Sequence, residues 1–249
     1  MAAACHYSDA LQSYRLAIDD ESVQADALFA CCMLLTLLSF KNLSSDQCIN
    51  DVSTSQKSFA LDTVGIRFIG GPRILEDVIS RQSMIYQGIW KNLFRHCAKR
   101  FVESDDMFAG SLSASQAMAG LEAVCRSDEI NGPFETALTS LRLLMQCYIS
   151  DMHKMVEFTF CFAIQLDPRF VRLVEEAMPK ALLVICYWYA LVAQVDQWWA
   201  CRTAQIEGIK LVGYLRDNVT GDSAVQALLE FPAQLLNSQS STTQTPIIL

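Results

Sequence analysis

The chain contains no Cys-x-x-Cys motif, although it holds ten cysteines in 249 residues. The cysteines are dispersed singly, apart from the adjacent Cys31 and Cys32. A zinc-cluster DNA-binding module needs six closely spaced cysteines, because its two zinc ions share thiolates at short range. The sequence therefore excludes such a module. His6 and His96 have no partners at ligand spacing, so we expect no metal site, which needs three or four converging ligands.

Positive charge is also scarce. The sequence has 19 lysines and arginines against 27 aspartates and glutamates, and a formal net charge of −8. A chain with this balance repels a phosphate backbone, since it has few cations with which to release counterions. We expect no direct binding of nucleic acid by this chain.

The chain lacks targeting and membrane-spanning signals as well. Its first residues show no basic region followed by an apolar one, which argues against a secretory signal peptide. The apolar run 181–193 is shorter than the roughly 20 residues that a bilayer-spanning helix needs. We therefore expect a cytoplasmic or nuclear protein that is not secreted and has no membrane span. Its thiols would be reduced and packed as small hydrophobic groups.

No stretch alternates apolar and polar residues over the length of a strand. Periodic apolar residues instead predict helices over residues 2–18, 23–40, 59–102 and 134–166. Polar turns are expected at 41–57, 103–114 and 127–133, and a break at 70–72. No linker rich in Pro, Gly or Ser divides the chain. The pattern predicts an all-α, single-domain bundle over residues 1–237, followed by a flexible tail over 238–249.

The stretch 167–216 is the most informative part of the sequence. Asp167 and Pro168 form a helix start, because a carboxylate caps free N–H groups and a proline suits the first turn. Pro179 ends that helix and begins another, which is apolar nearly all round and is therefore expected to be a buried core helix. A third helix is predicted over residues 197–216. It carries Trp198, Arg202 and Ile206 on one line.

Few residues suggest acid–base or metal chemistry. His153 lies one turn before Glu157, and a carboxylate at that spacing tunes an imidazole, although most such pairs are surface ion pairs. The candidate catalytic residues are His153, Glu157 and Asp196. The acidic clusters at 19–21 and 103–106 resemble terpene-cyclase motifs only in part and are better interpreted as solvated turns. No cofactor is expected.

The order of several short motifs resembles the ligand-binding domain of fungal zinc-cluster transcription factors of the sterol uptake control type. In the C-terminal half the motifs are Phe170-x-x-Leu173, Met178-Pro179-x-Ala181-Leu182, Tyr187-x-Tyr189-Ala190-Leu191, Trp198-Trp199 and Leu229-Glu230-Phe231-Pro232. In the N-terminal half they are His6-Tyr7, Tyr14-Arg15, Ala25-Asp26-Ala27-Leu28-Phe29, Met33-Leu34-Leu35 and Gly70-Gly71-Pro72-Arg73-Ile74-Leu75. The terminal Trp-Pro of the family is Phe231-Pro232 here.

The resemblance implies a helical domain that encloses a hydrophobic cavity, as in the family's sterol-binding domain. Apolar and aromatic side chains line such cavities, with a few polar groups. Ordinary core packing is the alternative meaning of the same residues. The expected ligand-binding residues are Phe158, Phe162, Met178, Tyr189, Trp199 and Arg202, with Asp196 or Gln194 as further polar candidates.

Two functions follow from these expectations. The first is a cofactor-independent cyclase of secondary metabolism, which folds a terpenoid, polyene or sterol-like molecule in its pocket, as a Diels–Alderase does. The second is a truncated ligand-sensing transcriptional regulator that lacks its own DNA-binding module. The initial methionine and the tail favour a complete stand-alone protein, and hence the first function. The apolar composition is compatible with a homodimer.

Overall fold

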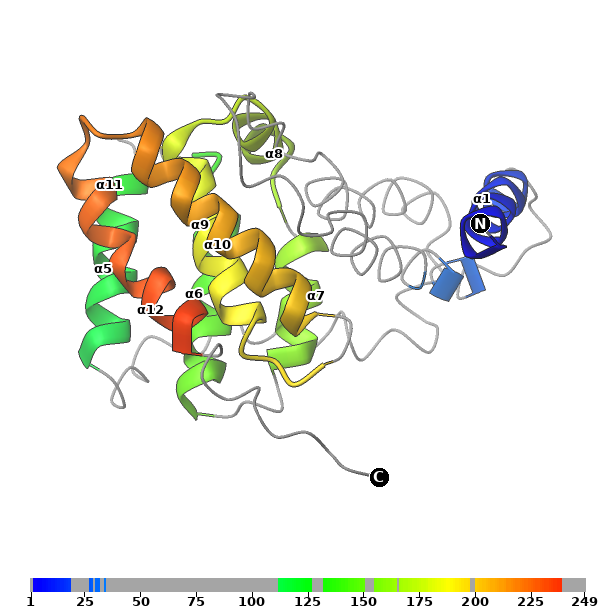
Figure 1. Ribbon diagram of the computed structural model, residues 1–249, viewed down its shortest axis with the longest axis horizontal. Coiled ribbons are helices and arrows are strands. Elements are labelled where there is room, and N and C mark those ends of the chain that lie inside the picture. The colour runs from blue at the N-terminus through cyan, green and yellow to red at the C-terminus, as the bar shows by residue number, and fades with distance from the viewer. Residues whose placement is uncertain are drawn as a thin grey trace.

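The computed structural model of the chain (Figure 1) describes residues 2–18, 27, 28, 30, 31, 34, 112–126, 132–150, 155–164, 166–197 and 200–238. The helices are α1 (Ala2–Ile18), α5 (Leu112–Cys125), α6 (Glu135–Ser150), α7 (Met155–Ile164), α8 (Pro168–Glu175), α9 (Pro179–Val192), α10 (Cys201–Asn218), α11 (Ser223–Leu228) and α12 (Glu230–Ser238). Within the described residues no strand occurs. The all-α expectation is confirmed, whereas the enclosed cavity and the single domain stay predictions.

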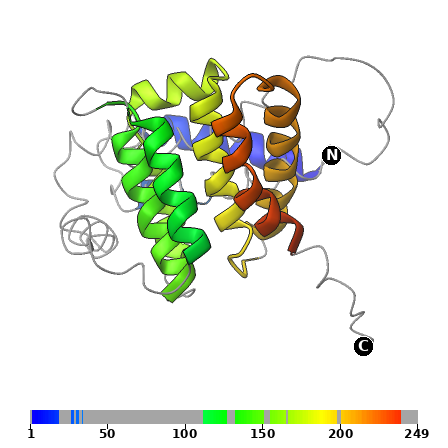
Figure 2. The same ribbon diagram turned by 90° about the vertical axis from the view of Figure 1, so that its left-hand side faces the viewer.

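Helix α9 is the centre of the bundle formed by α5 to α12. It contacts α5, α6, α8, α10, α11 and α12. Figure 2 shows α9 in yellow, between the green helices α5 and α6 on one side and the orange-to-red helices α10 and α12 on the other. Every residue from 181 to 192 is buried. The prediction of a buried core helix here is confirmed, because helices surround this apolar segment and leave no side for water.

The turn from α8 to α9 follows from its local sequence. Asp167 caps α8, since its carboxylate accepts the backbone N–H of Arg169 at 2.7 Å, and Pro168 occupies the first helical turn. At the other end Ala177 has a φ of 55° and Met178 N–H donates to the Leu173 carbonyl at 2.9 Å. This hydrogen bond belongs to a Schellman motif, which ends α8 just before Pro179 begins α9.

The segment predicted to be helical over 134–166, which is long enough to hold a bend, contains α6 and α7, with residues 151–154 outside the described part. Two expected helix limits differ from the structure. Helix α5 begins at Leu112, inside the polar turn expected at 103–114. Helix α10 begins at Cys201 rather than at residue 197. The backbone N–H of Gln197 donates to the Val195 carbonyl at 2.7 Å, so the chain makes a turn there before the helix begins.

The last two helices were not assigned from the sequence. Asp222 caps α11 by accepting the N–H groups of Ala224 and Val225 at 3.1 and 3.2 Å. The side-chain amides of Gln194 and Gln205 donate to the carbonyls of Leu235 and Leu236 at 3.0 and 3.1 Å. These bonds satisfy carbonyls that the last turn of α12 leaves without a helical partner. They attach α12 to the turn after α9 and to α10.

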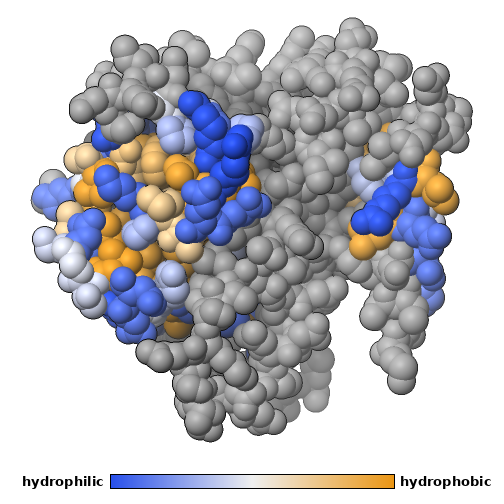
Figure 3. Space-filling view, turned by 90° about the horizontal axis from the view of Figure 1, so that it is seen from above, coloured by the Kyte–Doolittle hydropathy of each residue, from blue (hydrophilic) through white to orange (hydrophobic). Residues whose placement is uncertain are grey.

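Hydrophobic residues appear between hydrophilic ones on the face of the bundle seen from above (Figure 3). Among the described residues of α5 to α12, the large hydrophobic side chains that are exposed are those of Met178 and Ile209. In this described part of the chain, no helix is both long enough and apolar enough to cross a membrane. The predicted helices over 23–40 and 59–102 and the tail lie largely or wholly outside the described residues.

Candidate functional site

Three aromatic rings from α7 and α9 form a layer inside the bundle. Phe162 stacks on Trp188 with 5.4 Å between ring centroids and 16° between ring planes. Trp188 in turn contacts Tyr189 at 5.1 Å and 50°. We call Phe162, Trp188 and Tyr189 the aromatic cluster. Phe158 is buried one turn before Phe162 on α7. The cluster is buried, and aromatic side chains of this kind dominate cores and also line hydrophobic binding sites.

Burial disfavours the charged forms of one cysteine and two tyrosines of α9. It raises the pKa of the Tyr189 phenol, and the negative charge of Glu207 raises that pKa further. Burial also raises the pKa of Tyr187 and of the Cys186 thiol. The Tyr187 hydroxyl donates to the Leu228 carbonyl at 2.9 Å. At neutral pH these side chains carry no charge, because the low-dielectric interior disfavours the charged form.

The structure brings three of the residues expected to bind ligand into one region, namely Phe158, Phe162 and Tyr189. Met178 lies elsewhere, since it is exposed at the N-terminal end of α9. Eleven helical positions separate it from Tyr189, which corresponds to about 16 Å along the helix axis.

Arg202 is exposed in the first turn of α10, and Asp196 is exposed in the preceding turn. The negative charge of Asp196 adds to burial in raising the pKa of the Cys201 thiol. Gln194 donates to the end of α12. His153, Trp199 and the side chain of Glu157 lie outside the described part. The expected polar residues that are described therefore lie around the C-terminal end of α9.

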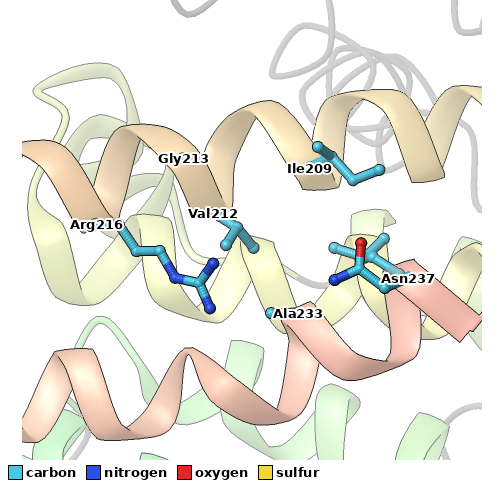
Figure 4. Close-up of a pocket in the computed structure, with 7 residues that line it drawn as sticks. Ile209, Val212, Gly213, Arg216, Ala233 and Asn237 are labelled. Carbon is cyan, nitrogen blue, oxygen red and sulfur yellow. The ribbon is translucent and has the colours of Figure 1, made fainter.

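A groove between α10 and α12 was not anticipated from the sequence. Its volume is about 190 Å³, and Figure 4 shows the residues that line it. The lining residues are Ile209, Val212, Gly213, Arg216, Ala233, Leu236 and Asn237. Val212 and Leu236 are buried, whereas Ile209 and Arg216 are exposed. The spacing 209, 212, 213 and 216 puts the α10 residues on one face of the helix. This spacing is the feature of the sequence that could have indicated the α10 side of the groove.

The charged groups of α5 and α6 connect these two helices. Glu122 accepts the Arg142 Nε–H at 2.8 Å and also lies 3.5 Å from the guanidinium of Arg126. The Glu122 side chain is mostly buried, so its charge is stabilised by both arginines. Among the described residues, no group of three or more His, Cys, Asp or Glu side chains is arranged to hold a metal ion. The candidate site there is thus the aromatic cluster rather than a charged centre.

The chain matches no protein-family model, no curated protein and no solved structure. The relation to the sterol uptake control family therefore remains a prediction from the ordered motifs.

Proposed function

We propose that this chain binds a hydrophobic small molecule against the aromatic cluster of α7 and α9. The observation that carries the proposal is the composition of the cluster, where Phe162 and Trp188 stack and Tyr189 adds a neutral phenol. Aromatic faces with one or two polar groups suit a terpenoid, polyene or sterol, because such a molecule gains its binding free energy from apolar contact.

The finer proposal is that the bound molecule cyclises. The phenols of Tyr187 and Tyr189 and the thiol of Cys186 are protonated at neutral pH, because their ordinary pKa values lie above 7 and burial raises each of them further. Such groups hold a substrate by shape and do not act as bases. A pericyclic reaction suits this environment, because it needs no proton transfer and gains rate when the reacting carbons are held close together.

The test begins with native mass spectrometry of the purified chain and organic extraction of copurified molecules. Incubation with polyene, terpenoid and sterol mixtures follows. A product of unchanged mass and new retention time, formed faster with protein than without, supports the cyclase. A lipid recovered unchanged supports binding without chemistry, and favours the ligand-sensing regulator suggested by the motif order. No bound molecule and no conversion would contradict the proposed function.

A matched pair of variants locates the binding site. Phe162→Leu removes a ring from the aromatic cluster, and Phe170→Leu removes an equally buried ring that packs edge-to-face on Phe134 at 5.5 Å. Both substitutions cost stability for the same reason. We expect only Phe162→Leu to weaken ligand binding, by at least about tenfold, measured by quenching of tryptophan fluorescence. Equal weakening of ligand binding in the two variants would mean that the ligand does not bind at the aromatic cluster.

A further inference from the structure

The outer side of α10 carries a stripe with coiled-coil spacing. Arg202, Ile206, Ile209, Gly213 and Arg216 follow one another at intervals of four, three, four and three residues. This is the spacing of the a and d positions of a heptad, which keeps one seam facing a partner helix. Ile209 is 44% exposed, although it is a large hydrophobic residue. Figure 1 shows α10 in front of α9. Arg202, Ile209 and Arg216 of the stripe are exposed, and Ile206 and Gly213 are half-buried, so the stripe lies on the side of α10 that faces solvent.

Gly213 makes a gap in this stripe. A Cβ built at Gly213 would meet no atom within 4 Å, so the surface is open at this position. Gly213 also lines the groove between α10 and α12. A glycine on a helix surface lets another helix approach closely, because no side chain keeps the two backbones apart.

The size of the groove indicates what it accommodates. Its volume is about 190 Å³. Sites for drug-sized ligands have roughly 300–1,000 Å³, and a cavity of about 150 Å³ in another protein holds a single benzene. The groove therefore fits one branched or aromatic side chain rather than a whole sterol. A side chain presented by another protein surface meets this requirement.

The charges at the two ends of α10 complement one another. Arg202 is exposed near the N-terminal end and Asp217 is exposed near the C-terminal end. In an antiparallel pair of identical helices, the N-terminal end of one lies beside the C-terminal end of the other. Each arginine then lies beside an aspartate. Arg216 is already neutralised within its own chain, since it is 3.0 Å from Glu230.

We propose that a second copy of this chain docks on this surface, with the two α10 helices antiparallel. The partner's Ile206 packs on Gly213 at the edge of the groove, and the partner's Asp217 pairs with Arg202. The two-fold axis repeats both contacts, as an isologous interface requires. Both contacts occur in one register, in which the numbers of two facing residues sum to 419, as for 206 with 213 and 202 with 217. The surface is self-complementary, because α10 carries both members of each contact. These are Ile206 with Gly213, and Arg202 with Asp217.

Sedimentation over a wide range of protein concentrations tests the proposal on the full chain. We expect a dimer with twice the 27.8 kDa mass of one chain. Gly213→Leu fills the gap and should weaken dimerisation by at least about tenfold. Ala227→Leu is the matched control, since it adds a leucine on the exposed side of α11 and should leave the dimer unchanged. Circular dichroism establishes that both variants are folded.

A charge exchange gives an independent readout. Arg202→Glu alone and Asp217→Lys alone each bring like charges together in a homodimer, so each should dimerise at least about threefold more weakly. A mixture of the two variants restores both ion pairs and should form heterodimers. A monomer at every concentration, a dimer unaffected by Gly213→Leu, or a mixture without preferred heterodimers would overturn the proposal. So would a monomer whose bound small molecule is displaced by Gly213→Leu, because the groove would then belong to that molecule.

Discussion

Helices α9 and α10 pack against each other, yet they relate to water in opposite ways. Every residue of α9 from 181 to 192 is buried. Helix α10 is longer and buries Thr203, Ala204, Gly208, Leu211, Val212 and Leu215 on its inner side. Its outer side stays exposed. The difference shows that α9 acts as the core of the bundle, whereas α10 covers that core on one side and is exposed to solvent on the other.

The largest effect is expected for Trp188→Ala in α9. The indole is fully buried and stacks on Phe162. Its removal leaves a large cavity, so the free energy of unfolding should fall by about 3–5 kcal/mol. Chemical denaturation measures this loss. At low protein concentration, where the monomer prevails, Ile209→Ala on the outer side of α10 is the control and should change the free energy of unfolding by less than about 1 kcal/mol. Equal losses of unfolding free energy in the two variants would contradict the assignment of α9 to the core and of the outer side of α10 to the surface.

High pH should destabilise the fold through the buried thiols and phenols. Burial raises the pKa of Cys186 and Tyr187 in α9, and raises the pKa of Cys125 from 9.0 to about 12. Below pH 9 these groups are protonated in both states, so their contribution to stability is fully present. Above pH 9 the unfolded chain loses protons that the folded chain retains, so stability falls as the pH rises towards the folded pKa.

Denaturation curves at neutral pH and near pH 10.5 measure this dependence. Cys186→Ala removes one of the responsible groups, and should make the free energy of unfolding depend less steeply on pH. The control is Cys31→Ala, because Cys31 is exposed. An identical pH dependence in all three proteins would contradict the assignment to buried thiols.

Gly208→Ala tests the inner side of α10. A Cβ at Gly208 would lie 2.8 Å from Leu236 Cδ2 and 3.2 Å from Tyr189 Cβ. The overlap costs about 1–3 kcal/mol, and the better helix propensity of alanine offsets about 1 kcal/mol of it. We expect a net loss of about 1 kcal/mol in the free energy of unfolding. A gain would mean that Leu236 and Tyr189 move apart without cost.

Gly213→Ala tests the outer side and should have the smallest effect, with the opposite sign. A Cβ there meets open space. Alanine restricts the unfolded chain more than glycine does, so the free energy of unfolding should rise by about 0.5–1 kcal/mol. The measurement is made at low protein concentration, where the monomer prevails. A loss of stability would show that the outer side of α10 is packed against another part of the chain.

Local signals in the sequence predicted the helix starts at Pro168 and Pro179 correctly. Each proline fixes its own φ and restricts the residue before it, and no distant contact is needed for that effect. The apolar character of the segment after Pro179 likewise predicted its complete burial. The start of α10 was predicted too early, because the turn at Gln197 depends on backbone hydrogen bonds that periodicity does not reveal.

The candidate site was predictable only in part. Phe158, Phe162 and Tyr189 were named from aromatic content and resemblance, and the structure buries all three in the region of α7 and α9. Met178 was named with them but lies at the far end of α9. The groove was missed because it needs Val212 of α10 and Ala233 and Leu236 of α12 to lie side by side. Nothing in either segment alone specifies this pairing.

The sequence by itself determined that the described chain is helical, that α9 is buried and that prolines separate α8 from α9. These properties follow from residue type and spacing, which act over one or two helical turns. Only the tertiary structure decided that Trp188 stacks on Phe162, and that Gly208 faces the core while Gly213 faces open space. The two glycines look alike in the sequence. Their difference arises because α12 packs on only one side of α10.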